Sequence, residues 1–426
     1  RSLFTTKSLR FNSGSSDRLN KTLGTPTNNY KWTYSFWIKR SKLGEEVAIT
    51  EAINNSQNKG LILFRSDDQL EIIDLISDSY VMQKKTNRVF RDTASWYHIV
   101  FSNDSTAGSP DLKIYVNGVE ETSLATDNEY SQNQAGSFNS AIANHIGASA
   151  SSRFSNCYFS EFVFIDGLQL AADQFGEFDS DSGIWKPIDV SGLTFGTNGF
   201  YLDFEDSSAL GNDAAGSNNF TVNNLTAVDQ STDTCTNNMP TINQLTLHSN
   251  GVTVSEGSLV ATTGDAPWQS TNCTFGLTTG KWYWEFKATE SSTNQYLVLG
   301  IQSDNLLSSA ANGFGYSNNY SYGFKNYNGE FVYNESDGGG SGSYGNAVTD
   351  GQIIGVALDL VNLEIYFSIN GTFQNSGDPT SGSSGTGSAG DLQSGQTYFP
   401  SLVIARAGGT GTIPIGEYNF GSPPYS

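Results

Sequence analysis

The sequence predicts an all-β fold with two β domains of related architecture, and three features support this prediction. An alternating apolar strand followed by Asn-Gly occurs twice, at residues 112–118 and 363–371. Asn and Gly tolerate the positive φ angles of a type I′ turn, so each copy indicates a β-hairpin. Apolar residues make up 37% of the chain, and the abundant Gly, Ser, Asn and Thr suit short strands joined by polar turns.

Length and charge limit the classes of partner. A chain of 426 residues can hold two or three domains, each with its own core. The formal net charge is −21, and from residue 246 onward there are four basic residues and fourteen acidic ones. Such a field repels phosphate backbones and anionic headgroups, which excludes nucleic acid and membrane surfaces as main partners. No apolar run reaches the length of a membrane span, so we expect no membrane insertion.

The cysteines and the start of the chain carry little functional information. Cys157, Cys235 and Cys273 are widely spaced and show neither metal-ligand spacing nor a disulfide framework. The chain begins at Arg1 without Met and without a signal peptide, which leaves open whether N-terminal residues are missing.

Alternating apolar residues predict the strands of the first half in order. Residues 3–11 and 30–38 alternate like strands that bury one face. Segment 168–175 is the one place with modest helical character. The remaining strand candidates are short apolar runs at residues 46–50, 60–65, 69–76, 96–102, 111–116 and 157–165.

These runs occur in five blocks whose order is that of a known family. The blocks are SLRFNSGSSDRLN, WTYSFWIKR, ASWYHIVFSND, LKIYVNGV and HIGAS…CYFSEFVFIDGLQLAADQF. Together they resemble the laminin-G-like, concanavalin A-like lectin/glucanase domain. The resemblance implies a jelly-roll sandwich of two antiparallel sheets and a first domain over residues 1–180.

Residues 181–245 change in character. GIWKPIDVSG and GFYLDFEDSS read as short strands, and the rest is rich in Asn, Asp, Thr and Ser with little periodicity. The apolar residues Phe220, Val222, Leu225 and Val228 could pack on a neighbouring surface. We therefore expect a connector packed on one or both domains rather than a free linker.

The second half, residues 246–426, contains a second series of predicted strands. They lie at residues 245–247, 252–254, 258–262, 281–288, 296–302, 321–325, 330–334, 352–360, 363–369, 398–405 and 417–420. The blocks GKWYWEFKA, YLVLGIQSD, YGFKNYNGEFVYN, GQIIGVALDL, LEIYFSINGTFQ, YFPSLVIA and YNFG follow the order of a SPRY domain, which this half resembles. The resemblance implies a bent β-sandwich that binds a partner without catalysis. The predicted fold class is thus all-β, with two antiparallel β-sandwich (jelly-roll, concanavalin A-like) domains in tandem.

Two Gly/Ser-rich loops depart from this pattern, at residues 336–346 and between Gly371 and Tyr398. They have too few apolar groups to pack. If the strands at 352–360 and 363–369 are antiparallel, both loops lie at one end of the sandwich. The second loop puts in doubt any binding surface carried over from the family on that side.

Catalytic residues are not expected. Glycoside hydrolysis requires two carboxylates about 5–10 Å apart. The spacing of Glu161 and Asp166 points them to opposite faces of a strand, and no third acid follows Asp203 and Glu205 at the required offset. His98 lies inside a strand and is expected to be structural. The histidines are scattered, without a nucleophile beside them, at positions 98, 145 and 248.

A calcium site is possible at one loop. Asp179 and Asp181 begin a sequence like a calcium loop, but its twelfth position is Val190 rather than Glu. Laminin-G-like domains often bind calcium, so the resemblance implies Ca²⁺ as the one candidate cofactor. A solvated turn is the alternative, and no other cofactor is expected.

Aromatic residues among Asn and Gly provide the candidate ligand-binding residues. Sugars stack on exposed aromatic rings, and their hydroxyls require neutral donors and acceptors. The stretch 312–333 combines Tyr, Phe, Asn and Gly near predicted turns. The candidates are Tyr316, Tyr320, Tyr327, Asn318 and Asn319. Strand alternation also accounts for several aromatic residues of this stretch as core residues.

The order of a laminin-G-like domain, an Asn/Thr-rich connector and a SPRY domain resembles structural proteins of tailed bacteriophages. This implies a non-catalytic virion protein, as a fibre, an appendage or a capsid decoration. It would bind host-surface glycans or neighbouring virion proteins, and we expect a homo-oligomer located in the virion. A bacterial extracellular adhesin at the cell surface is the alternative, and a glycoside hydrolase of concanavalin A-like fold is a third, less favoured one.

Overall fold

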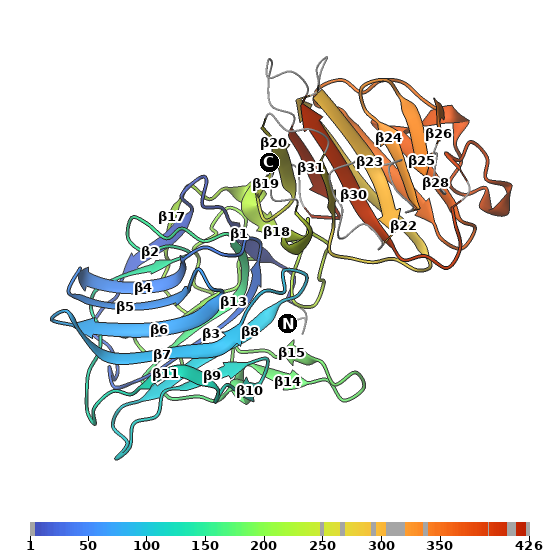
Figure 1. Ribbon diagram of the computed structural model, residues 1–426. Coiled ribbons are helices and arrows are strands. Elements are labelled where there is room, and N and C mark those ends of the chain that lie inside the picture. The colour runs from blue at the N-terminus through green and yellow to red at the C-terminus, as the bar shows by residue number, and fades with distance from the viewer. Residues whose placement is uncertain are drawn as a thin grey trace. The chain divides into compact units, whose positions relative to one another are not determined.

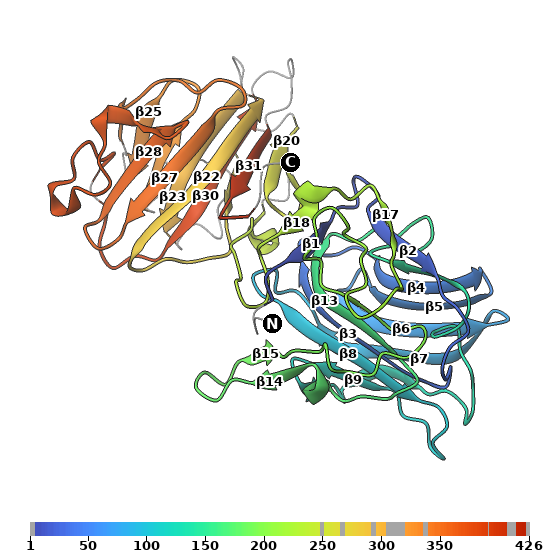
Figure 2. The ribbon, with the colours of Figure 1, turned by 180° about the vertical axis from the view of Figure 1, so that it is seen from behind.

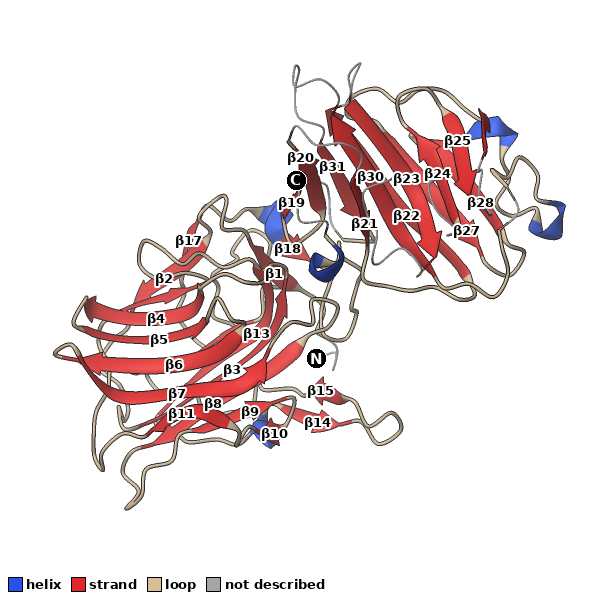
Figure 3. Ribbon diagram, in the orientation of Figure 1, coloured by secondary structure: helices blue, strands red, loops and turns tan. Residues whose placement is uncertain are grey.

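The computed structural model confirms the predicted fold class, with two antiparallel β-sandwiches in tandem. It describes residues 5–247, 251–264, 269–290, 295–303, 320–334, 340–390, 392–406 and 415–422. The chain forms two compact units, Arg1–Asn238 and Met239–Tyr425. In the described parts the helical segments are 3-10 turns of three residues (Figure 3), namely η1 (Ala172–Gln174), η2 (Ala227–Asp229), η3 (Gln244–Thr246), η5 (Gln374–Ser376) and η6 (Gly382–Ser384). None of the described helical segments has the length and apolar character needed to cross a membrane.

The first unit consists of two eight-stranded sheets and a short hairpin (Figures 1 and 2). Sheet A has the order β10 (Val119–Glu120), β9 (Lys113–Val116), β8 (Tyr97–Asp104), β3 (Lys31–Arg40), β13 (Cys157–Asp166), β1 (Ser8–Phe11) and β18 (Gln230–Ser231), with β16 (Phe200–Leu202) also paired to β13. Sheet B has the order β11 (Leu124–Asn128), β7 (Ser79–Val89), β6 (Gln69–Ile76), β5 (Asn58–Phe64), β4 (Val47–Asn55), β12 (Ala143–Ile146), β2 (Arg18–Thr22) and β17 (Thr221–Asn223). The hairpin pairs β14 (Gly176–Phe178) with β15 (Trp185–Pro187).

Sheet A is buried on both faces, which corrects the one-sided burial predicted for residues 30–38. In β3, Trp32, Tyr34 and Phe36 belong to the core between the two sheets, whereas Trp37 belongs to a second apolar cluster. That cluster comprises Trp37, Trp96, Val100, Tyr158, Val163, Ile165, Ala172, Phe175, Trp185, Val190 and Tyr201. Residues that follow β13 supply several of these side chains. The pattern of β3 alone therefore could not indicate that its second face is also buried.

The segment predicted as a connector belongs largely to the first unit. The division between the units falls after Asn238, and the first domain therefore extends beyond the predicted boundary at residue 180. Three of its strands complete the sheets, since β16 pairs with β13, β17 with β2 and β18 with β1. Phe220 and Leu225 are buried, and Val222 packs against the same core.

A buried ion pair fastens the end of this segment to sheet A. The Nζ atom of Lys39 lies 2.8 Å from Oδ2 of Asp233, and both side chains are almost fully buried. Trp96 donates its indole N–H to Asp233 Oδ1 at 3.0 Å, and Lys39 also donates to Asn238 Oδ1 at 2.8 Å. Burial lowers the pKa of Lys39, although Asp233 acts in the opposite direction.

Asp74 gives the first unit a pH dependence that can be measured. Its buried carboxylate accepts hydrogen bonds from Tyr130 Oη at 2.6 Å and Ser137 N at 2.8 Å, but burial outweighs them and raises its pKa to about 6. A raised pKa means that the folded state prefers the protonated acid. The protonated Asp74 therefore stabilises the fold fully below the unfolded pKa of about 3.8. This stabilisation is lost as the pH rises to about 6.

We therefore expect Asp74→Asn to reduce the loss of stability between about pH 4 and pH 7 by about 2–3 kcal/mol. The free energy of unfolding, measured in denaturant at both pH values, tests this expectation. Asp78→Asn is a matched control, because Asp78 is exposed. Equal pH dependence in the wild type and in Asp74→Asn would contradict the assignment.

The second unit consists of two further antiparallel sheets. Sheet C has the order β19 (Val252–Ser255), β20 (Val260–Thr263), β31 (Ile415–Asn419), β22 (Lys281–Glu290), β27 (Ile353–Asp359), β28 (Glu364–Ile369) and β29 (Thr372–Phe373). Sheet D has the order β21 (Gln269–Asn272), β30 (Tyr398–Arg406), β23 (Gln295–Ser303), β24 (Ser321–Lys325), β25 (Glu330–Asn334) and β26 (Gly340–Ser343). Apolar side chains from both sheets, among them Trp284, Phe286, Phe324 and Phe367, form one core.

The second Gly/Ser-rich loop packs on the sandwich, contrary to the prediction. It covers Tyr366, whose exposed fraction is 1%, and Ala389 N donates to Ile365 O at 2.8 Å along the free edge of β28. Hydrogen bonds hold much of the loop together. For example, Thr380 N donates to Asp378 Oδ1 at 2.9 Å. The loop therefore shields the edge of β28 with backbone and small polar groups.

Both predicted Asn-Gly hairpins are confirmed. Asn117 and Gly118 have φ angles of 49° and 81° and join β9 to β10. Asn370 and Gly371 have φ angles of 48° and 79° and join β28 to β29. Positive φ at both central residues is the requirement of a type I′ turn.

The three cysteines are free thiols. Cys157 and Cys273 are buried and Cys235 is half-buried. Burial raises the pKa of each thiol well above its ordinary value.

Candidate functional site

The two Gly/Ser-rich segments meet at one edge of the second unit, beside β26. The Tyr344 hydroxyl donates to Gly387 O at 3.1 Å, and Asn346 N donates to Gln374 Oε1 at 3.1 Å. The two segments were expected to lie together if the strands at 352–360 and 363–369 are antiparallel. β27 and β28 do pair in this way. Between them lies a cavity of about 480 Å³, which we name the edge pocket.

Gly342 of β26 leaves the space open, whereas the Tyr333 ring fills the space beside Gly340. Gly340 lies opposite Tyr333 and Gly342 opposite Phe331 in the ladder between β25 and β26. Directly opposed residues of antiparallel strands project to the same face, so these glycines leave that face of β26 without side chains. A Cβ atom added at Gly342 would meet no atom within 4 Å. The aromatic rings of β25 therefore border an empty volume.

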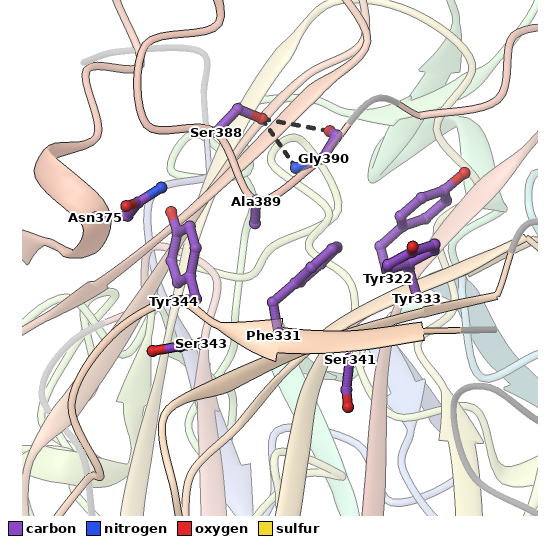
Figure 4. A pocket seen from close by; sticks show the side chains of 11 residues that line it. Tyr322, Phe331, Tyr333, Ser341, Ser343, Tyr344, Asn375, Ser388, Ala389 and Gly390 are labelled. Atoms are coloured by element: carbon purple, nitrogen blue, oxygen red, sulfur yellow. Dashed lines mark hydrogen bonds between the residues drawn. The ribbon is translucent and has the colours of Figure 1, made fainter.

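Aromatic rings form the apolar wall of the edge pocket (Figure 4). The rings of Phe331 and Tyr333 are stacked, with centroids 5.7 Å apart and an interplanar angle of 19°. Phe331 and Tyr344 are largely buried, and Tyr333 is 36% exposed. Tyr333 is therefore the ring that a ligand can reach most easily.

Neutral polar groups form the rest of the lining. Within the described part of the chain, the side chains of Tyr333 and Asn375 have no hydrogen-bond partner, so they are available to a ligand. Ser388 already has a hydrogen-bond partner, because its Oγ accepts from Gly390 N at 3.2 Å (Figure 4). None of the eleven lining residues carries a charge. The pocket thus combines an aromatic face with uncharged donors and acceptors.

Of the predicted ligand-binding residues, Tyr320 and Tyr327 are described and are not among the residues that line this pocket. Tyr316, Asn318 and Asn319 lie outside the described residues. Tyr320 packs against the core, and the Tyr327 ring lies 4.7 Å from that of Tyr296 at 80°. Their role in binding stays a prediction.

The lining residues that the prediction missed are Tyr322, Phe331, Tyr333, Ser341, Gly342, Ser343, Tyr344, Asn375, Ser388, Ala389 and Gly390. A usable signal was present in the sequence. The alternation of glycine in GSGSY, next to the alternating aromatic residues of FVY, marks a strand pair with space on one face.

The candidate calcium ligands lie in the turn between β14 and β15. Asp179 Oδ1 accepts from Ser182 N at 2.9 Å and Asp181 N at 3.1 Å, and Asp179 Oδ2 pairs with Lys186 Nζ at 3.0 Å. These hydrogen bonds hold the pKa of Asp179 well below its usual range. No group of three or more His, Cys, Asp or Glu side chains suited to a metal ion occurs in the described ranges. Calcium binding at Asp179 and Asp181 stays a prediction.

The acidic residues considered for catalysis have separate structural partners. Glu161 lies at a bulge of β13 and accepts a hydrogen bond from Tyr201 Oη. Asp166 is buried and accepts from Thr27 N at 2.7 Å, Asn198 N at 3.0 Å and Asn139 Nδ2 at 2.6 Å. Burial would raise the pKa of Asp166, but these hydrogen bonds outweigh it and lower the pKa.

His98 is a structural residue, as predicted, and its ring contacts Trp37 and Trp185 of the second apolar cluster. Trp185 donates its indole N–H to His98 Nδ1 at 2.9 Å, so the ring proton lies on Nε2, which is 2.9 Å from Ser35 Oγ. Complete burial lowers the pKa of His98 to about 3, which keeps the ring neutral.

The fold defines a tandem β-sandwich protein. Residues 13–168 match the concanavalin A-like lectin/glucanases superfamily, and residues 281–387 match the SPRY domain. The first unit therefore contains a concanavalin A-like domain and the second a SPRY domain, which confirms both resemblances. These domain types indicate a binding role. No curated protein sequence matches the chain.

Several solved structures are similar to parts of the chain. The SPRY domain of human HERC1 has 16% sequence identity and a TM-score of 0.32, covering 42% of this chain and 96% of that one. A native heptameric SAP-like pentraxin from Limulus polyphemus has 17% identity and a TM-score of 0.31, covering 41% and 82%. A protein from Bacteroides ovatus ATCC 8483, named as an assumed carbohydrate binding protein, has 17% identity and a TM-score of 0.34, covering 51% and 58%.

Proposed function

We propose that the chain is a non-catalytic structural protein of a tailed-bacteriophage virion that binds a neutral glycan of the host surface through the edge pocket. The observation that carries the binding part is the edge pocket itself, with stacked rings beside unpartnered neutral polar groups. A sugar ring gains apolar contact with an aromatic face, and the hydroxyls of the sugar bond to Asn and Tyr groups.

Charge favours neutral over anionic sugars. The pocket lining carries no basic residue, and the net charge of the chain is −21. Uronic or sialic acids would lose hydration without gaining an ion pair. The virion setting rests on the order of the two domains and the resemblance stated above. Neighbouring virion proteins and further copies of the chain are the expected partners.

Filling the pocket should abolish glycan binding while the fold is kept. Gly342 does not have a positive φ, and a Cβ there meets open space, so Gly342→Val fits the strand and occupies the cavity. We expect the variant to keep its melting temperature and to lose at least about tenfold in affinity, because the sugar loses its place beside Tyr333. Titration calorimetry with neutral gluco-, galacto- and manno-oligosaccharides measures the effect.

Ser341→Val is the matched control, because the Ser341 side chain points away from the ring cluster (Figure 4). Wild-type affinity in Gly342→Val would refute the pocket as the glycan site. Normal adsorption of phage carrying Gly342→Val, together with a failure to assemble particles, would instead assign the pocket to subunit contacts. Mass spectrometry of purified particles tests the virion location separately.

A further inference from the structure

A second surface of the SPRY-containing unit lies on the outer face of sheet C, around Tyr283 of β22. The Tyr283 side chain is 52% exposed, and its hydroxyl donates to Glu285 Oε1 at 2.9 Å. A Cβ atom added at Gly355 of the neighbouring strand would lie 2.5 Å from Tyr283 Oη and 3.1 Å from its Cε2 atom. The ring therefore lies over the space that Gly355 leaves free, with its other side exposed to solvent.

The hydrogen bond to Glu285 holds the hydroxyl end of Tyr283. Partial burial and this hydrogen bond raise the pKa of Tyr283 to about 12. The hydroxyl thus stays protonated and donates to the carboxylate at neutral pH. A ring held in this way loses little conformational entropy when a ligand stacks on it.

A small cavity of about 190 Å³ adjoins the ring, and its lining includes Tyr283, Glu285, Asn419 and Ser422. This volume lies below the roughly 300–1,000 Å³ of small-molecule sites, so it suits a single side-chain head group. None of its lining residues is basic. It shares no residue with the edge pocket, so the inference drawn from it is independent of the glycan proposal.

We propose that Tyr283 and Glu285 bind a cationic side chain, arginine or lysine, of a partner protein. The face of an aromatic ring attracts a cation, and a carboxylate beside it adds a charge-assisted hydrogen bond. A cation gains Coulomb attraction from both the ring face and the carboxylate, which a neutral sugar does not. The acidic balance of the second half steers a basic partner to this unit.

The test uses the full chain and two synthetic peptides that differ at one atom per side chain. One peptide alternates arginine with glycine, and the other carries neutral citrulline in place of each arginine. Surface plasmon resonance should show binding of the arginine peptide, weakened by salt, and at least about fivefold weaker binding of the citrulline peptide. Tyr283→Leu and Glu285→Gln should each weaken binding of the arginine peptide about fivefold.

Two control variants separate this site from general attraction of a polycation. Tyr80→Leu removes a 54% exposed tyrosine of the first unit, and Glu330→Gln removes another acid of the second unit. Both should bind the arginine peptide like the wild type. Equal binding of the two peptides, or wild-type binding by Tyr283→Leu, would overturn the proposal. If Tyr283→Leu fails to fold, Glu285→Gln decides, because it keeps the ring.

Discussion

Asp233→Ala should lower the free energy of unfolding of the first unit by about 3–5 kcal/mol. The substitution leaves the ammonium group of Lys39 buried without its counter-ion and the indole N–H of Trp96 without its acceptor. It also releases the end of the connector segment from sheet A. Denaturant unfolding of the full chain measures the loss, and hydrogen exchange of β3 peptides locates it in the first unit.

Two controls show whether burial causes the effect. Asp67→Ala removes an ion pair of the same 2.8 Å length with Lys85, but Asp67 is 51% exposed, so the cost should be about 0–1 kcal/mol. The double variant Lys39→Met/Asp233→Leu should be more stable than Asp233→Ala, because no unpaired charge remains. A similar loss for Asp67→Ala and Asp233→Ala would contradict the assigned role of the buried pair.

Gly118→Val should destabilise its unit by more than Gly371→Val destabilises the other. Both glycines have the left-handed φ that disfavours valine, which costs about 1–3 kcal/mol. A Cβ at Gly118 would in addition lie 2.3 Å from Trp185 Cε3, whereas at Gly371 it meets no atom within 4 Å. Crowding of this kind costs about 1–3 kcal/mol more.

The comparison of the two variants is itself the control, because the turns have the same geometry. Thermal unfolding of the full chain, with each transition assigned by hydrogen exchange, gives both losses. Equal losses would show that Trp185 moves aside freely. Unchanged melting of either unit would show that the turn does not need its glycine.

The sequence predicted most strands whose apolar residues alternate, and it missed those whose stability comes from their neighbours. β7, with the sequence SYVMQKKTNRV, is largely polar, and its position depends on pairing with β6 and β11. β26 consists of Gly and Ser and exists because β25 provides a ladder. Local patterns cannot indicate such strands, since the stabilising contacts are distant in the chain.

The same reason explains why the full extent of the first domain and the edge pocket were not predicted. Some apolar residues of the connector, such as Trp185, cover the outer face of sheet A, and others, such as Phe220, fill the core between the two sheets, so their spacing follows no single period. The edge pocket itself was not predicted. Its residues were missed because the space arises from the register of β25 and β26, which places Gly342 opposite Phe331.

The chemistry of the thiols has a practical consequence. Because the reactive species is the thiolate, the raised pKa values of Cys157, Cys235 and Cys273 make these residues slow to alkylate or oxidise at neutral pH. A cysteine introduced at Ser341, on the rim of the edge pocket, would react first with a maleimide dye. The variant Ser341→Cys can therefore carry a single fluorescent label beside the edge pocket without removal of any of the native cysteines.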